Sequence, residues 1–186
     1  VVLWRPLQEM DGDWFWWGTR NAKYDPSLYI ALWRDMFHYF TDTKGLHNLL
    51  WVFSPTMQKT VSIGKLYPGA EYVDIVAPTT YQDDLIIGDV AFLQHYNNVL
   101  GMGEFGSQSW RGWNDASGSY SLRGSFDDTL FVRRLVNTYP SIAYWVSWHN
   151  WSNGDGTSEH QALVSNKNAS VLMNDARVIT LSRLSW

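Results

Sequence analysis

Two glutamates in this 186-residue chain stand just past the end of an apolar run, where a carboxylate is unusual. Glu9 follows the segment Val1–Leu7, and Glu104 follows the segment 98–103. A carboxylate beside buried strand residues is unfavourable unless it is solvated, paired or functional. Each could be a solvated loop carboxylate, but a pair of them suits glycosidic bond hydrolysis. In that reaction one acid protonates the leaving oxygen, and the other carboxylate attacks the sugar carbon or activates water.

Tryptophan is unusually frequent, with 12 Trp in a chain that is 16% aromatic. Some of these residues fall in stretches rich in Gly, Asp, Asn and Ser, where core packing explains them poorly. They indicate a surface that stacks on flat apolar faces such as those of sugar rings. This group is Trp14, Trp16, Trp17, Trp110, Trp113, Trp148 and Trp151. In contrast, Trp33 on a helical face and Trp51 inside an apolar run are expected in the core.

The elements that must position these residues alternate between strand and helix patterns. Strands are predicted at Val1–Leu7, Asn48–Pro55, Tyr72–Ala77, 98–106 and Ser141–Trp148. Helices are predicted from Asp25 to Gly45, within 56–70, around 90–96, from a capping box at Ser125 and Asp128 to Tyr139, and near Asn168–Asn174.

This alternation predicts an α/β fold of parallel βα units, with strands buried on both faces and one domain over residues 1–186. Chemistry in such folds lies at the carboxyl ends of the strands. Those ends carry Gln8 and Glu9, Ser54 and Pro55, Thr80 and Tyr81, Glu104, and Trp148.

Charge and composition argue against several other classes of function. The net charge is −4 without a basic stripe, which argues against a nucleic acid partner. No apolar run approaches the length of a membrane helix. The chain has no Cys, and His149 and His160 are isolated, so no metal site and no cofactor are expected.

Four motifs resemble glycoside hydrolase family 26. The first is RPLQEMDGDWFWWG, which is similar to the acid/base motif of the family, RPLHEMNG-x-WFWWG. The others are GLHNLLWVFSP, YPGAEYVDIV and GEFG, in the family's order and at roughly its spacing. The segments WVSWHNW and ALVSNKNASVLMNDARVIT resemble its last strand and final helix, so the resemblance covers nearly the whole chain.

The resemblance implies a retaining endo-β-1,4-mannanase on a (β/α)8 TIM barrel, secreted, monomeric and acting on β-mannan. It implies that Glu9 is the acid/base, Glu104 the nucleophile and Tyr81 the hydrogen-bond partner of that nucleophile. Trp14 and Trp148 match aromatic residues of the substrate cleft, and Trp17, Trp16, Trp110 and Trp113 are looser candidates for more distal subsites.

Two departures from the family pattern affect these expectations. Gln8 stands where the family usually has His, beside the sugar at subsite −1, and it cannot carry a proton charge. By the resemblance, Val1 begins strand four, so the chain holds strands four to eight of a partial barrel, truncated at the N-terminus and with bare edges. The alternatives are a β-1,3-1,4-glucanase or β-1,3-xylanase of the same family, a non-catalytic carbohydrate-binding remnant, or an inactive fragment.

Overall fold

The computed structural model describes residues 1–19, 25–56, 62–81, 93, 95, 99–106, 124, 126–152 and 158–184. The chain divides into two compact units, which are described separately. The first holds the described residues of 1–80, 87–103 and 141–145, and the second those of 81–86, 104–140 and 146–186.

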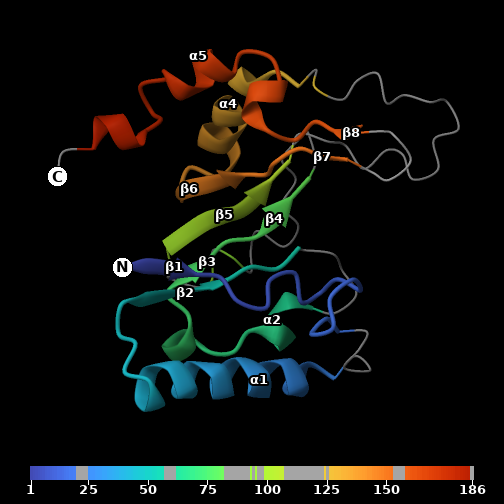
Figure 1. Cartoon of the computed structure of the whole chain (residues 1–186), viewed down its shortest axis with the longest axis vertical. Coiled ribbons are helices and arrows are strands. Elements are labelled where there is room, and N and C mark those ends of the chain that lie inside the picture. Colours follow the sequence, from blue (N-terminus) through green and yellow to red (C-terminus); the bar gives the residue numbers. More distant parts are fainter. Residues whose placement is uncertain are drawn as a thin grey trace, which may run out of the picture. The chain divides into compact units, whose positions relative to one another are not determined.

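Parallel strands form the centre of the first unit (Figure 1). The strands are β1 (Val2–Trp4), β2 (Leu49–Phe53), β3 (Ile75–Val76), β4 (Thr79–Thr80), β5 (Val99–Phe105) and β6 (Ile142–Ser147). The order is β1-β2-β3-β5-β4, and β6 also pairs with β5. The pairings β1 with β2, β2 with β3 and β3 with β5 are all parallel, which confirms the prediction of βα units.

Helices lie between these strands along the chain. They are α1 (Pro26–His38), the π-helix η1 (Tyr39–Thr43), α2 (Ile63–Leu66) and the 3-10 helix η2 (Ala70–Tyr72). The start of α1 is as predicted: the Asp25 carboxylate accepts a hydrogen bond from the Ser27 amide at 2.9 Å, and Pro26 takes the first helical position. After η1 the chain turns at Gly45, whose φ of 64° favours glycine.

The core of the first unit forms where α1 and α2 cover β2. Trp33 of α1 is fully buried, and its ring lies against Trp51 and Phe53 of β2 at centroid distances of 5.9 and 6.1 Å. The Trp33 indole also donates to the Tyr72 carbonyl at 3.1 Å. The prediction that Trp33 and Trp51 are core residues is therefore confirmed.

Two strand predictions need correction. The segment predicted as a strand over Tyr72–Ala77 is a strand only at Ile75–Val76, because Tyr72 closes η2. The expectation that strands are buried on both faces is wrong for β1, in which Val2 and Leu3 are 46% and 50% exposed. In the described part of the chain β1 has β2 as its only strand neighbour, so its apolar side chains are less covered than those of β2.

The second unit contains two packed helices, α4 (Asp128–Thr138) and α5 (Ala169–Met173), in the upper part of Figure 1. It also contains the antiparallel pair β7 (Trp151–Ser152) and β8 (Ser158–Glu159), which the sequence patterns did not predict. Short 3-10 helices, η4 (Leu163–Ser165) and η5 (Leu181–Arg183), lie on either side of α5 in the sequence.

The N-cap of α4 is Asp127 and not the predicted Ser125, which lies outside the described residues. The Asp127 carboxylate accepts from the Thr129 amide at 3.0 Å and from the Asn168 side chain at 3.0 Å. These donors favour the charged form and lower the pKa of Asp127. Asp127 therefore ties the beginning of α4 to the residue that precedes α5.

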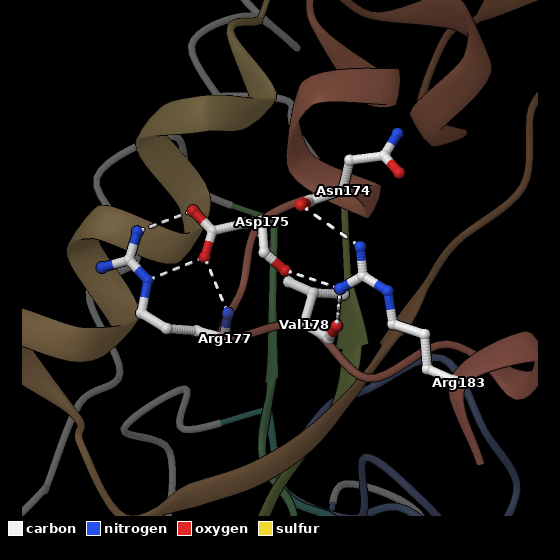
Figure 2. A network of polar contacts seen from close by, with 5 residues as sticks. All are labelled: Asn174, Asp175, Arg177, Val178 and Arg183. Atoms are coloured by element: carbon white, nitrogen blue, oxygen red, sulfur yellow. Dashed lines mark hydrogen bonds and ion pairs between the residues drawn. The ribbon is translucent and has the colours of Figure 1, made fainter. Parts of the chain in front are cut away.

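A polar network secures the segment that follows α5 (Figure 2). The Asp175 carboxylate accepts hydrogen bonds from the amide and the guanidinium of Arg177, and these bonds lower the pKa of Asp175. Arg183 donates to the carbonyls of Asp175 and Val178 at 2.9 and 2.8 Å. Arg183 of η5 therefore holds the backbone of the segment that follows α5.

Candidate active site

Glu9 lies in a loop after β1 whose backbone conformation is unusual. Glu9 and Leu7 have φ values of 56° and 49°, in the left-handed region that residues with a Cβ rarely adopt. Such a conformation costs roughly 1–3 kcal/mol per residue and persists where surrounding contacts enforce it. One such contact is the hydrogen bond from the Glu9 amide to the Ser54 carbonyl, at 2.7 Å, just after β2.

The Glu9 carboxylate is buried and is held by two neutral donors. Trp14 donates its indole N–H to Oε2 at 2.9 Å, and Thr79 donates its hydroxyl to Oε1 at 2.8 Å. Glu9 is 9% exposed, so only a small part of it reaches solvent.

The aromatic residues after Glu9 divide into exposed and packed members. Trp14 and Trp16 are 49% and 68% exposed, which is unusual for such large apolar side chains. Trp17 is half-buried and stacks on Phe15 with ring centroids 4.4 Å apart. Its indole donates to the Gln8 carbonyl at 2.8 Å, so Trp17 supports the backbone next to Glu9.

Glu104 and Tyr81, which belong to the second unit, form a close pair. Glu104 is 4% exposed near the end of β5, and the Tyr81 hydroxyl donates to its Oε2 at 2.6 Å. A short O–H···O bond to a carboxylate is stronger than one between neutral groups. It orients the plane of the Glu104 carboxylate.

Gly106 leaves room for the side chains of Gln161 and Tyr81 next to the backbone that follows Glu104. A Cβ at this glycine would lie 2.2 Å from Oε1 of Gln161 and 2.3 Å from Cδ1 of Tyr81. No side chain fits in that space, so Gln161, which is 2% exposed, lies beside the chain that follows Glu104. Trp148 is held here as well, through a backbone hydrogen bond of 2.8 Å from its amide to the Phe105 carbonyl.

Three residues of the site were missed by the sequence patterns. Thr79 and Gln161 come close to the glutamates only through long-range folding, and nothing local to them indicates it. Asp11 is fully buried, and its carboxylate accepts from the amide and the hydroxyl of Thr56 at 2.7 and 2.9 Å. Its position two residues after Glu9 was the one available signal. Trp110 and Trp113 lie outside the described residues.

Asp11 also acts on its surroundings electrostatically. Burial, together with the charge of Asp11, raises the pKa of Tyr29 well above its ordinary value. The Tyr29 hydroxyl donates to the carbonyl of Leu7 at 3.3 Å, so the neutral tyrosine is the form that supports the loop.

Among the described residues, no three His, Cys, Asp or Glu side chains gather as they would around a metal ion. His149 lies against Trp148 with ring centroids 4.8 Å apart. Within the same ranges, every helix is too short or too polar to cross a membrane.

Comparison with known proteins identifies the family. The profile of "Glycosyl hydrolase family 26" matches residues 1–181. The chain belongs to this family. It is 38% identical over 180 residues to a mannan endo-1,4-beta-mannosidase of Bacillus subtilis (strain 168), a match that covers 94% of the chain and 44% of the relative. It is 33% identical over 190 residues to mannan endo-1,4-beta-mannosidase A and B of Caldalkalibacillus mannanilyticus, covering 100% of the chain and 33% of the relative.

Solved structures of the family agree with this assignment. The Bacillus subtilis mannanase BCman superposes with a TM-score of 0.74 at 34% identity, over 96% of this chain and 48% of that one. The family 26 chain therefore has the fold of a partial (β/α) barrel, and it spans less than half the length of these relatives.

Proposed function

We propose that this chain carries the catalytic carboxylates of a retaining endo-β-1,4-mannanase, with Glu104 as nucleophile and Glu9 as acid/base. The observation that carries the proposal is the family match over residues 1–181, which includes both glutamates. The relatives named above are mannan endo-1,4-beta-mannosidases, which supports mannan as the substrate. Both carboxylates are buried and oriented by donors, as groups with defined roles should be.

The chemistry follows from these surroundings. An oxygen of Glu104 attacks the anomeric carbon while Glu9 gives its proton to the glycosidic oxygen, which leaves as an alcohol. Glu9, now a carboxylate, removes a proton from water, and that water displaces Glu104 from the sugar. Tyr81 holds the nucleophile through Oε2 and so fixes the orientation of the Glu104 carboxylate. Trp14 and Thr79 stabilise Glu9 in its ionised state between the two steps.

The roles are tested by Glu9→Ala and Glu104→Ala, with Glu71→Ala as control because Glu71 is an exposed glutamate of η2. Loss of Glu104 should abolish turnover of every substrate. Loss of Glu9 should reduce mannan hydrolysis by about 10²–10⁴-fold. It should spare kcat/KM for aryl mannosides whose leaving group needs no proton, while their kcat falls because Glu9 also activates water in the second step. Added azide should rescue Glu9→Ala with retained configuration and Glu104→Ala with inverted configuration. Mannan hydrolysis at the parent rate by either variant would exclude the assignment.

Aromatic residues are the proposed substrate platform. Trp14 contacts Glu9 and is half exposed, so it can contact a sugar next to the scissile bond, and Trp148 and Trp17 are proposed to line neighbouring positions. Trp14→Ala and Trp148→Ala should each raise KM for mannan. The control variant Glu71→Ala, at an exposed residue, should leave KM unchanged. Unchanged KM in both would remove them from the substrate-binding surface.

Gln8 supports a second candidate substrate within the family, β-1,3-1,4-glucan or β-1,3-xylan. Its backbone is fixed by Trp17, so a different side chain here changes the chemistry presented to a sugar without moving the loop. Release of reducing sugar from mannan, mixed-linkage glucan and β-1,3-xylan distinguishes these substrates. In Gln8→His, a shift of preference towards mannan would assign the specificity to this residue.

A further candidate is a carbohydrate-binding chain without catalysis, for which the exposed Trp14 and Trp16 would supply the sugar-stacking surface. It predicts retention on insoluble mannan without any soluble product. A cooperative unfolding transition of the 186-residue chain would distinguish a binding protein from an inactive fragment. We also propose that residues 1–186 belong to one catalytic domain. We propose that the protein is a monomer, which sedimentation would test, and that it is located outside the cell, which fractionation of the producing cells would test.

A further inference from the structure

The loop that carries Glu9 needs support from outside, because its backbone is locally unfavourable. Leu7 and Glu9 are two of the three non-glycine residues with positive φ in the described part of the chain. Neither has a short polar side chain that could stabilise this conformation by bonding its own backbone. The direction in which Glu9 points therefore depends on the contacts that hold residues on both sides of it.

Before Glu9, the supports act on the backbone. Tyr29 of α1 donates to the Leu7 carbonyl, and Trp17 donates to the Gln8 carbonyl. The Glu9 amide itself donates to the Ser54 carbonyl. These bonds place the backbone of Glu9 next to the end of β2.

After Glu9, a buried side chain makes the connection. Asp11 is 0% exposed and accepts two hydrogen bonds from Thr56, one from its amide at 2.7 Å and one from its hydroxyl at 2.9 Å. Thr56 is two residues from Ser54, just as Asp11 is two residues from Glu9. The loop is thus fastened at two adjacent points to the segment 54–56, and Asp11 provides one of them.

From this geometry we infer that Asp11 is a positioning residue for the acid/base: it clamps the Glu9 loop to Thr56 and so aligns the Glu9 carboxylate with the leaving oxygen. A buried carboxylate is a costly way to close an ordinary loop, and two directed bonds fix both the distance and the rotation of the loop. The inference rests on the proposed function, since it assigns Asp11 an effect on the proton-transfer step only.

A positioning role for Asp11 predicts unequal losses of activity on two kinds of substrate, whereas a general loss of stability would affect both equally. In Asp11→Ala, turnover of mannan-derived oligosaccharides should fall by about 10²-fold, because a displacement of about 1 Å suffices for such a loss. The value of kcat/KM for an aryl mannoside with a good leaving group, which reports the first step, should change little. Asp11→Asn should restore most of the activity, since its carbonyl accepts from the Thr56 amide and its NH₂ can donate to the hydroxyl. Asp13→Ala, an exposed aspartate of the same loop, is the control.

A double substitution shows whether Asp11 acts through Glu9. In a Glu9→Ala background, Asp11→Ala should cause no further loss on either substrate, because the group it aligns is gone. Equal losses on both substrates in the single variant, or a full additional loss in the double variant, would overturn the inference. Should Asp11→Ala fail to fold, Thr56→Val removes one of the two bonds and is judged by the same ratio of activities.

Hydrogen exchange of the Glu9 amide, which does not depend on enzymatic activity, tests this inference separately from the proposed function. In Asp11→Ala the amide of Glu9 should exchange its hydrogen faster, while amides within α1 keep the parent rates. If the parent hydrolyses neither substrate, the proposed function fails, and hydrogen exchange still decides whether Asp11 holds the loop. Exchange of the Glu9 amide at the parent rate in Asp11→Ala and Thr56→Val would refute the clamp.

Discussion

Replacing Asp128 with asparagine should stabilise the protein near pH 7 and have little effect near pH 4. Asp128 occupies the first position of α4 and is 1% exposed, and neither of its carboxylate oxygens has a hydrogen-bond partner among the described residues. Burial, followed by the charge of Asp127, raises the pKa of Asp128 to about 7. The fold therefore favours the protonated acid, and ionisation opposes folding.

The magnitude follows from proton linkage. A raised pKa means that the folded state binds the proton more tightly, so its contribution to stability is complete below the unfolded pKa of 3.8 and is lost as the pH rises to about 7. At 1.36 kcal/mol per pKa unit, ionisation of Asp128 lowers the free energy of unfolding by on the order of 2–4 kcal/mol. This range allows for the helix dipole, which favours an anion at this position. Asparagine has no such proton to lose.

The assay is urea unfolding of the parent and Asp128→Asn at several values between pH 4 and pH 8. The difference in free energy of unfolding should grow across this range and then level off, since effects of other carboxylates cancel in the difference. Asp127→Asn is the matched control with opposite sign, because the pKa of Asp127 is lowered and its contribution is lost as the pH falls. A difference for Asp128→Asn that is constant with pH would refute the reasoning.

Three further outcomes are expected. Tyr81→Phe removes a hydrogen bond to a buried carboxylate, worth about 1.5–3 kcal/mol, so the melting temperature should fall and kcat on aryl mannosides should fall by up to roughly 10–150-fold. Gly106→Ala should lower both kcat and the melting temperature, because its Cβ would overlap Gln161 and Tyr81; calorimetry and kinetics together test this. Arg183→Ala should speed proteolysis of the segment after α5 without altering activity, as limited digestion followed by mass spectrometry would detect. Parent-like kcat in Tyr81→Phe or Gly106→Ala, or a parent-like rate of proteolysis in Arg183→Ala, would contradict the corresponding contact.

Sequence patterns predicted secondary structure and burial correctly where neighbouring residues alone decide them. The start of α1 needed only Asp25 and Pro26, whose capping and fixed φ act within one turn. The burial of Trp33 and Trp51 followed from apolar spacing. The cap of α4 was misplaced because several polar residues in sequence can each serve, and the contact between Asp127 and Asn168 decides which one does.

For the site, the order of residue types along the chain was enough to indicate the family, the two candidate glutamates and the tryptophans near them. How the carboxylates are held depends on contacts between residues far apart in the chain. Thr79 reaches Glu9 from 70 residues away, and Asp11 reaches Thr56 from 45. The left-handed backbone at Glu9 is likewise invisible in the sequence, since it is unfavourable locally and exists because distant contacts enforce it.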